Sequence, residues 1–484
     1  MVRPRISLLT KSEMQEINEG ALDILEKVGV MCKNVNALSI LHKAGAEVDN
    51  SKQIAKISKD LVKYALEKAP SSLKLFSRDG KRNIELKENN VCFNPGSTAI
   101  NVLDFETNKV RKGLTRDLID FVRVADALDN IHAQSTSIIC SNVSEEISDV
   151  YRLFLVLKNS TKPIITGAFS IEGINYMKNI LSTIVGEENL AKKPLAIFDA
   201  CPSPPLMWSE ITSQNVIDCA KNGLPVEIIP MPLSGATGPV TIAGSIVQHT
   251  AEGLSGVVLA QLANPGAPII YGGSPAPFEM RFLTTPMGAI ETMLIDCAYS
   301  QMGKFYGLPT HAYIGLSDSK IVDAQVGFES GIGLILGALA GINVISAPGM
   351  MDFESCQSIE KLVIDNDICG MALRLIKGIH VDNETLAVDL IKNVGPGKQF
   401  LTTEHTRKWF RAEHFLPSTV VDRLSHERWE KEGSKNTFER AHNLVKKILS
   451  EHRPEELPAD VEKDLNVKML EIAKKHGMAK LPKE

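Results

Sequence analysis

The chain has 484 residues, of which 44% are hydrophobic and 23% are charged, and its formal net charge is −5. This composition is typical of a globular protein with a large core, and the slight excess of acid argues against a nucleic-acid groove, which is usually basic. No basic stretch followed by an apolar run opens the sequence, and Gly, Pro or polar residues interrupt every apolar stretch before about 18 residues. We therefore expect a cytoplasmic protein without a signal peptide or a membrane span.

Residues 1–90 predict a mostly helical N-terminal cap. Apolar positions recur at helical spacing over residues 12–30, and this pattern ends at Gly29. We expect further helix to about residue 68, followed by a polar, hairpin-like stretch around Asp79-Gly80.

Residues 91–380 alternate between short β-rich runs and helical stretches. The β-rich runs are Val91–Asn94, His132–Ile139, Pro163–Thr166, Leu195–Asp199, Val226–Pro230, Pro268–Tyr271, Thr310–Ile314 and Asn343–Ala347. Strand–helix repetition predicts a parallel sheet. An open doubly wound sheet is the alternative, but about eight units without Gly-x-Gly-x-x-Gly after the first strand favour an α/β fold closed as a (β/α)₈ TIM barrel.

Residues 381–484 predict a C-terminal helical extension that ends in a charged tail. From Pro454 onward the chain is rich in Lys and Glu, which indicates a solvated packing arm. The helical exterior and this tail are compatible with a homo-oligomer, which we expect. Asp365 and Asp367, in the last barrel helix, are interpreted as surface charges.

The eight cysteines are scattered along the chain, with no Cys-x-x-Cys pair and no partnered His spacing. This pattern argues against a zinc or iron–sulfur site and indicates small buried residues of a reducing cytosol. We expect no protein-bound metal.

Barrel enzymes carry their chemistry on the loops that follow the strands, so these loops hold the candidate site. The loop after the sixth run, Tyr271–Phe282, combines aromatic rings with a carboxylate and a guanidinium, and the seventh, Gly315–Lys320, follows His311 and Tyr313. Aromatic faces attract a quaternary ammonium group, and an Arg or a His would hold a carboxylate. The pattern therefore suits a zwitterion such as a betaine.

Simpler explanations remain open for several of these residues. Phe278 and Phe282 lie four apart and could form the apolar stripe of a short helix, whereas His311 could be a hydrogen-bonded core histidine and His249 a helix-terminal one. The Gly-Gly-Ser at 272–274 could bind phosphate through its backbone N–H groups. No Gly-x-Ser-x-Gly and no phosphate loop is present.

Three long stretches resemble one family in combination. They are Leu233–His249 (LSGATGPVTIAGSIVQH), Ala260–Gly272 (AQLANPGAPIIYG) and Gly315–Gln325 (GLSDSKIVDAQ). The chain resembles the trimethylamine:corrinoid methyltransferase superfamily from Leu8 to near Trp409. The resemblance implies a (β/α)₈ barrel that moves a methyl group from an amine to the Co(I) of a cobalamin-type corrinoid, carried by a separate partner protein.

The founding members of that superfamily carry pyrrolysine, which this chain lacks. Tyr313–Ser317 is the best candidate for the equivalent position. The chain resembles the branch that acts on quaternary amines such as glycine betaine, and the missing pyrrolysine argues against trimethylamine itself as the substrate.

Residue chemistry then assigns expected roles. Trp208, Tyr271, Phe278, Phe282 and Tyr313 are candidates for an ammonium cage; Glu279 and Asp318 would supply catalytic negative field; and Arg281, His311 or His249 would hold a carboxylate. Demethylation of a quaternary ammonium releases a neutral tertiary amine, so no general acid is needed, and positioning with exclusion of water remains the main task.

Two further functions remain open. Lys320 could be the Schiff-base amine of a barrel lyase or aldolase, which requires a lowered pKa inside the barrel. Alternatively, the chain could be a non-catalytic scaffold that binds a betaine or a corrinoid protein.

Overall fold

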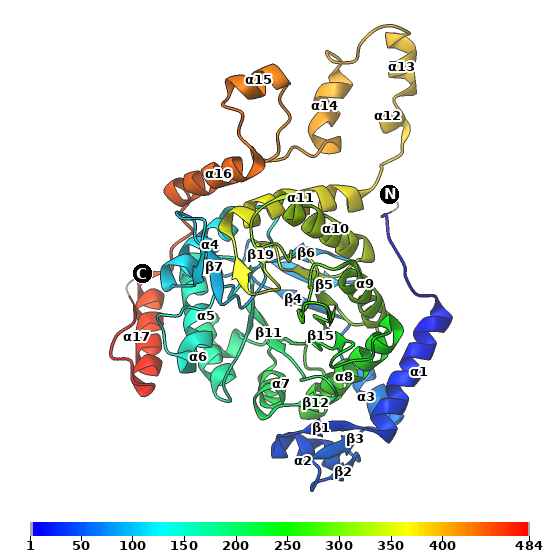
Figure 1. The fold of residues 1–484 in the computed structure, drawn as a ribbon, viewed down its shortest axis with the longest axis vertical. Helices are drawn as coiled ribbons and strands as arrows, with labels where there is room; N and C mark the ends of the chain where they lie inside the picture. Colours follow the sequence, from blue (N-terminus) through cyan, green and yellow to red (C-terminus); the bar gives the residue numbers. More distant parts are fainter. Residues whose placement is uncertain (1–2, 483–484) are drawn as a thin grey trace.

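The computed structural model describes residues 3–482, and its centre is a ring of parallel strands surrounded by helices (Figure 1). The ring consists of β6 (Cys92–Phe93), β9 (Gln134–Ser135), β10 (Ile164–Gly167), β11 (Ala196–Ala200), β13 (Val226–Ile228), β15 (Ile269–Tyr271), β17 (His311–Tyr313) and β18 (Val344–Ser346). Each strand overlaps one of the predicted β-rich runs, and β10 and β11 extend one residue beyond theirs.

Two sheets, ordered β15-β13-β11-β10-β9 and β17-β18-β6, make up the ring. A parallel bridge between Tyr271 and Thr310 joins β15 to β17. At the other junction, the backbone N–H of His132 donates to the carbonyl of Phe93 over 2.7 Å. The sheet is therefore closed, which confirms the TIM barrel and excludes the open doubly wound sheet.

The helices around the barrel are α4 (Thr115–Ala127), α5 (Ser148–Asn159), α6 (Gly173–Val185), α7 (Glu210–Asn222), α8 (Ile242–Ala263), α9 (Ile290–Phe305), α10 (Ala324–Ala340) and α11 (Ile359–Lys377). Short 3₁₀ helices, η1 (Glu145–Ile147) and η2 (Glu187–Asn189), precede α5 and follow α6. Gly333 allows α10 to pack closely on the barrel, because a Cβ there would lie 1.9 Å from the carbonyl oxygen of Ile314.

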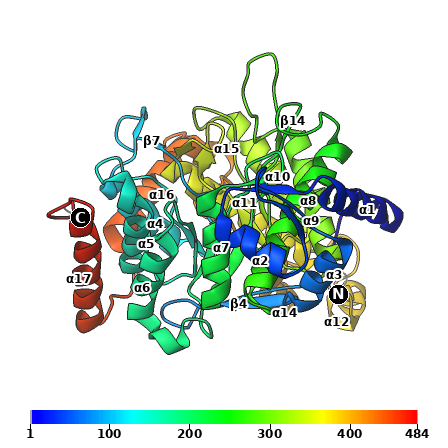
Figure 2. The same ribbon diagram turned by 90° about the horizontal axis from the view of Figure 1, so that it is seen from below.

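A hairpin closes the amino end of the barrel. The strands β4 (Ser72–Leu75) and β5 (Ile84–Lys87) pair antiparallel around Asp79-Gly80, as the sequence predicts. Leu73, Leu75 and Leu86 of the hairpin cluster with one inward-facing residue from each of five barrel strands: Cys92, Ile165, Ile197, Ile270 and Val344. Figure 2 shows this hairpin at the base and the long loops at the opposite end, which we call the mouth.

This apolar cluster, which we call the plug, shows which strand side chains face the barrel interior. Strand side chains alternate between the two faces, so residues two positions beyond the plug also face inward, one layer nearer the mouth. From four of these strands, that layer receives Asn94, Asp199, Gly272 and Ser346.

The N-terminal cap contains more strand than the sequence predicts. Besides α1 (Lys11–Lys27), α2 (Val35–Lys43) and α3 (Lys59–Lys68), it holds β1 (Val30–Cys32), β2 (Glu47–Asp49) and β3 (Ile54–Lys56). Strand β12 (Met207–Trp208), from the loop after β11, pairs with β1. The expected helices are present to residue 68, but strands of three residues, which carry too little periodicity to be recognised, interrupt them.

Two smaller sheets lie among the loops of the mouth. Strands β19 (Met350–Met351), β20 (Cys356–Gln357), β7 (Asn101–Leu103) and β8 (Val110–Lys112) form one of them, and β14 (Leu233–Ser234) pairs with β16 (Ala276–Pro277) in the other. They brace the loops after β6, β13, β15 and β18.

The C-terminal region forms an extension along one side of the barrel (Figure 1). Its helices are α12 (Asn383–Leu386), α13 (Val388–Val394), α14 (Glu404–Glu413), α15 (His426–Lys431), α16 (Thr437–Glu451) and α17 (Ala459–Lys475). Helix α16 packs on α11 and α4, and α17 packs on α5 and α6. The domain boundaries at residues 90 and 380 stay a prediction.

The interpretation of Asp365 and Asp367 as surface charges was wrong, because both are buried. Asp365 accepts hydrogen bonds from the ammonium of Lys361 and the backbone N–H of Gly349, and Asp367 accepts two from Ser418. The outer side of α11 is covered by α16 and by the chain around residue 418, which sequence periodicity cannot reveal. In residues 3–482 no helix is both long enough and apolar enough to cross a membrane.

Candidate active site

A layer of polar side chains crosses the barrel one level above the apolar plug. We call Asn94, Asp199, Glu227, His311 and Ser346 the inner ring, since each lies on a different barrel strand or directly after it. Asn94, Glu227, His311 and Ser346 are at most 1% exposed. Asp199 and Glu227 are paired in register on neighbouring strands, which brings their carboxyl groups together.

Hydrogen bonds among Asn94, Ser346 and His311 determine where the protons of this part of the inner ring lie. The hydroxyl of Ser346 donates to Oδ1 of Asn94 over 2.7 Å, so Nε2 of His311, 2.7 Å from the same hydroxyl oxygen, is the donor to it. Burial lowers the pKa of His311 to about 3, so the ring is neutral and its Nδ1 carries a lone pair.

That lone pair faces Oε2 of Glu227 at 3.4 Å. Two acceptors do not approach each other without a proton between them, and burial together with the neighbouring Asp199 raises the pKa of Glu227 well above its usual value. Glu227 is therefore the protonated member of the carboxyl pair.

Asp199 carries the remaining negative charge of the pair. Burial raises the pKa of Asp199 above its usual value, and its hydrogen bonds with Glu227 and Tyr313 offset only part of that rise. The hydroxyl of Tyr313 is 3.4 Å from Oδ2 of Asp199 and 2.9 Å from the hydroxyl of Ser97. Two carboxyl groups in contact retain one proton between them, so the pair has about one negative charge near neutral pH.

Two further acids, Asp318 and Glu354, lie nearer the mouth, and we call them the outer acids. Glu354 ends a run of left-handed residues, Asp352 (φ 50°), Phe353 (φ 54°) and Glu354 (φ 67°). Such a conformation costs roughly 1 kcal/mol or more per non-glycine residue, and strain of this kind concentrates at functional sites. The hydroxyl of Ser274 donates to Oε1 of Glu354 over 3.2 Å.

Burial shifts the pKa values of the two outer acids into the physiological pH range. It raises the pKa of Glu354 to about 7 and that of Asp318 to about 6, and the charges of Asp318 on Glu354 and of Glu329 on Asp318 add to these shifts. The backbone N–H of Asp318 donates to Oε2 of Glu329 over 2.8 Å, which fixes the loop after β17.

The structure brings three of the predicted site residues to this region: His311, Tyr313 and Asp318. The ring of Tyr313 lies edge-on to that of His311, with 4.8 Å between centroids. Tyr313 is therefore an aromatic side chain in hydrogen-bonding contact with an acid of the inner ring.

Tyr271 and His249 lie outside the barrel. Tyr271 follows the inward-facing Ile270, so its ring points toward α8 and α9, where it closely approaches Gly253 and Gly303. His249 stacks on Tyr299, with 4.1 Å between ring centroids, and burial lowers the pKa of His249 to about 3. These rings form an aromatic core between the sheet and the helices. Their placement does not favour the expected role of Tyr271 in an ammonium cage or of His249 in holding a carboxylate.

The remaining aromatic and charged candidates lie on the cap or on an exposed turn. The indole N–H of Trp208 donates to Ser255 within the buried cap interface. Arg281 holds Glu279 through two hydrogen bonds of 2.8 and 2.7 Å, while Phe282 is 72% exposed and Phe278 is partly buried. None of these side chains joins the inner ring.

Lys320 also lies at the surface. Its ammonium donates to the carbonyl of Asp318 over 2.6 Å and lies 3.7 Å from the ring centroid of Phe353. The side chain is 56% exposed. A Schiff-base lysine requires burial or a cationic neighbour to lose its proton, and this placement provides neither.

Sequence reasoning missed Asp199 and Glu227 as site residues, although a signal was present. Both are acids inside otherwise apolar strand runs, and fully buried acids are rare unless they are paired. Glu354 had no comparable signal, because its position depends on an irregular loop. The described part of the chain contains no cluster of His, Cys, Asp or Glu suited to a metal ion, and its eight cysteines are free.

Fold and site together define a TIM barrel with an acid-lined mouth. Among solved structures, the chain is similar to the monomethylamine methyltransferase MtmB of Methanosarcina barkeri, with a TM-score of 0.55 over 92% of this chain and 88% of that chain. Sequence identity is 11%, so this likeness concerns the fold.

The profile of the trimethylamine methyltransferase (MTTB) family matches residues 2–477. The trimethylamine methyltransferase MttB of Desulfitobacterium hafniense is 32% identical over 97% of this chain and 94% of its own length. The corresponding protein of Methanosarcina thermophila is 34% identical, covering 95% and 96% of the two chains. A glycine betaine methyltransferase of D. hafniense is 31% identical over 98% of both. This chain belongs to the trimethylamine methyltransferase family, and it is a methyltransferase.

Proposed function

We propose that this protein transfers a methyl group from a quaternary amine, glycine betaine or a related betaine, to the Co(I) of a corrinoid on a separate protein. The observation that carries the proposal is the buried carboxyl pair of Asp199 and Glu227, which shares one negative charge and lies against the hydroxyl of Tyr313 inside the barrel. A fixed anion and an aromatic face are the groups that attract a permanent organic cation. The outer acids, which lie nearer the mouth than Asp199 and Tyr313, add to the negative electrostatic potential at the site.

The roles of the residues follow from this chemistry. Tyr313 and Asp199 hold the ammonium, and the protonated Glu227 keeps the pair at one negative charge, which matches one positive charge on the substrate. The corrinoid supplies the nucleophile that takes the methyl group. The C–N bonding electrons stay on nitrogen, so a neutral tertiary amine leaves and no side chain has to donate a proton. The barrel then serves to orient the methyl group and to exclude water.

Arg152 is our candidate for the carboxylate end of a betaine. Its side chain is fully buried, Nη1 donates to the carbonyl of Thr136 over 2.6 Å, and Nη2 has no partner among the described residues. Phe169, on the loop after β10, covers the guanidinium at 4.8 Å. Arg281, by contrast, is already paired with Glu279 at the surface.

The exposed turn around Phe282 then gains a different role from the one expected. Met280, Phe282 and Leu283 are 58%, 72% and 74% exposed on the loop after β15, and Val240 nearby is 69% exposed. An exposed apolar group beside a mouth is typical of a protein–protein contact. We propose that the corrinoid protein docks on this turn.

Replacing both Phe282 and Leu283 with Ala is expected to raise the KM for the corrinoid protein by roughly tenfold, since two exposed apolar anchors are lost. The KM for the amine should stay unchanged, because neither side chain reaches the inner ring. Initial rates at varied corrinoid-protein concentration measure the effect. A raised KM for the amine would instead return Phe282 to the substrate site.

The decisive test is anaerobic incubation with cob(I)alamin and a panel of amines, followed by the visible spectrum of methylcobalamin. We expect methyl transfer from at least one of glycine betaine, proline betaine, carnitine and γ-butyrobetaine. Transfer from trimethylamine alone would refute the quaternary-amine assignment. Binding of a betaine without any transfer to cob(I)alamin or to a corrinoid protein would favour the scaffold.

A further inference from the structure

The two outer acids lie on different loops of the mouth. Asp318 belongs to the loop after β17, and Glu354 belongs to the loop after β18. A backbone hydrogen bond of 3.2 Å joins these loops, from the N–H of Asp352 to the carbonyl of Ser319. This bond ends two positions before Glu354, so the placement of that acid depends on what holds the residues in between.

The side chain of Lys320 spans the same two loops. Its ammonium donates to the carbonyl of Asp318 over 2.6 Å, within its own loop. It also lies 3.5 Å from Oδ1 of Asp352 and 3.7 Å from the ring centroid of Phe353, both on the other loop. An ammonium is attracted by a carboxylate and by an aromatic face. One side chain therefore connects the backbone of one outer acid to the residue that precedes the other.

The turn that Lys320 contacts is strained. Asp352, Phe353 and Glu354 all have left-handed φ values, and non-glycine residues keep this conformation only where surrounding contacts impose it. The hydroxyl of Ser355 donates to Oδ2 of Asp352 over 3.0 Å, which holds the first residue of the run. Lys320 holds the second through the ring of Phe353. Loss of this contact would let the segment before Glu354 relax toward ordinary φ values.

We propose that Lys320 is a positioning residue, whose contacts with Asp352 and Phe353 form a lock that fixes the separation of the two outer acids. The inference rests on the proposed function, in which these acids attract a quaternary ammonium group. Lys320 acts through the acids rather than on the substrate, because its side chain is 56% exposed and its charge repels a cation. The lock gives this exposed lysine a role that does not depend on Schiff-base chemistry.

The charge of Lys320 has the opposite effect on substrate binding from the lock. Burial raises the pKa of Asp318 to about 6, and the charge of Lys320 offsets part of that rise. At pH 8 Asp318 is mostly ionised, so removing the lysine leaves the acid charged and takes away one repulsive cation. Electrostatics alone therefore predicts tighter binding of a quaternary amine without Lys320, whereas loss of the lock predicts weaker binding.

The test compares Lys320→Met with Lys320→Arg at pH 8, with cob(I)alamin saturating. We expect the Met variant to lower kcat/KM for the quaternary amine by roughly tenfold, mainly through KM, because misplaced groups around a bound substrate are costly. Arg stacks on a ring and pairs with a carboxylate, so it should restore kcat/KM to within about twofold. A Met variant that equals or exceeds the wild type would overturn the proposal, as would an Arg variant no better than Met.

Lys408→Met is the matched control. Its ammonium is also paired with an acid, Glu384, and lies 5.5 Å from the ring centroid of Trp409. The side chain is 60% exposed, close to the value for Lys320, but it belongs to α14 of the C-terminal extension. We expect unchanged kcat/KM. An equal loss in both Met variants would count against a specific role for Lys320.

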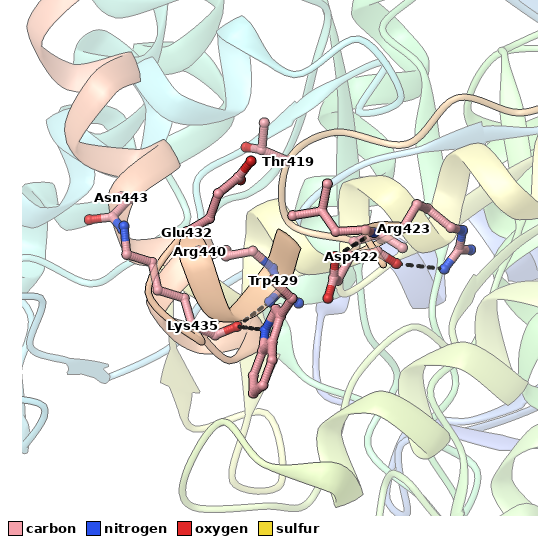
Figure 3. Close-up of a pocket in the computed structure, with 10 residues that line it drawn as sticks. Thr419, Asp422, Arg423, Trp429, Glu432, Lys435, Arg440 and Asn443 are labelled. Atoms are coloured by element: carbon pink, nitrogen blue, oxygen red, sulfur yellow. Dashed lines mark hydrogen bonds between the residues drawn. The ribbon is translucent and has the colours of Figure 1, made fainter. Parts of the chain in front are cut away.

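A cleft in the C-terminal extension offers another aromatic face, but its charges disfavour a cation. The cleft has a volume of about 400 Å³ and includes the ring of Trp429 (Figure 3). Its charged lining residues are Asp422, Arg423, Glu432, Lys435 and Arg440. Three of these five are cations, so a quaternary amine is expected at the acid-lined mouth instead. The KM in this test then reports on the outer acids.

Hydrogen exchange of residues 350–357 gives a second readout that needs no substrate. The N–H of Ser355 donates to the carbonyl of Asp352 over 3.0 Å inside the turn. This amide should exchange about fivefold faster in Lys320→Met and at the wild-type rate in Lys320→Arg, while the barrel strands stay protected in both. Unchanged exchange in the Met variant would overturn the lock. If the wild type demethylates no quaternary amine, the proposed function fails, but the exchange result still decides whether the lock exists.

Discussion

Replacing Asp199 with Asn is expected to lower kcat/KM for the quaternary amine by roughly 100-fold. Two unit charges 4 Å apart interact by about 4 kcal/mol at an effective dielectric constant of 20, and loss of about two thirds of that corresponds to this factor. Asn keeps the shape of the side chain and can still accept the hydrogen bond from Tyr313, so the change removes mainly the charge. Steady-state rates with cob(I)alamin at saturating concentration measure the loss.

Glu252→Gln is the matched control for this substitution. Glu252 is another buried acid, on α8 outside the barrel, where it accepts hydrogen bonds from the backbone of Leu206 and the amide of Gln248. Burial raises its pKa to about 7, so neutralising it is a comparable change. We expect nearly unchanged activity for this control. An equal loss in both variants would show that Asp199 acts through stability rather than by holding the cation.

The second large effect expected is a rise in kcat/KM with pH, by up to about tenfold between pH 6 and pH 8. Burial raises the pKa of Glu354 to about 7, so this group is mostly protonated at pH 6 and mostly ionised at pH 8. A cation binds better to the ionised form, which sets the direction of the change. A quaternary amine has no proton to lose, so the profile reports on the protein.

Glu354→Gln should remove most of this rise and leave the smaller part that comes from Asp318, whose pKa is about 6. The same substitution should affect stability in a defined direction. A carboxyl whose pKa is raised by folding costs stability as pH rises from its unfolded value to its folded value, so the variant should lose less stability between about pH 4.5 and pH 7. Chemical denaturation at several pH values measures this difference. A wild-type profile that the variant reproduces unchanged would remove Glu354 from the site.

The sequence could identify residues on the barrel strands as candidates, but it could not tell which of them face the barrel interior. Tyr313 and His311 could be chosen because they lie on the predicted strand that leads into the seventh loop, and such loops hold the site of a TIM barrel. Tyr271, at the end of a predicted strand, satisfied the same rule, but its ring lies in the helix layer instead. The difference is one position of strand register, which decides the face on which a side chain lies.

The sequence also could not predict where the loop residues of the candidate site lie, because their positions depend on loop conformation. Glu279 and Arg281 were placed together correctly, but their mutual pairing leaves them at an exposed turn. Glu354 reaches the mouth through consecutive left-handed residues, a conformation that non-glycine residues adopt only when surrounding contacts impose it. No local pattern predicts such a segment.

The sequence by itself determined the barrel: eight β-rich runs alternate with helical stretches, and both signals are local in the chain. It also marked the family through long stretches that follow one another in order. Only the tertiary structure decided which strand residues face the interior, because the hairpin plug fixes that orientation through Leu73, Leu75 and Leu86. It likewise decided the charge of the inner ring, since the proton on Glu227 follows from contacts among Asn94, Ser346 and His311, which are remote in sequence and meet only when the barrel closes.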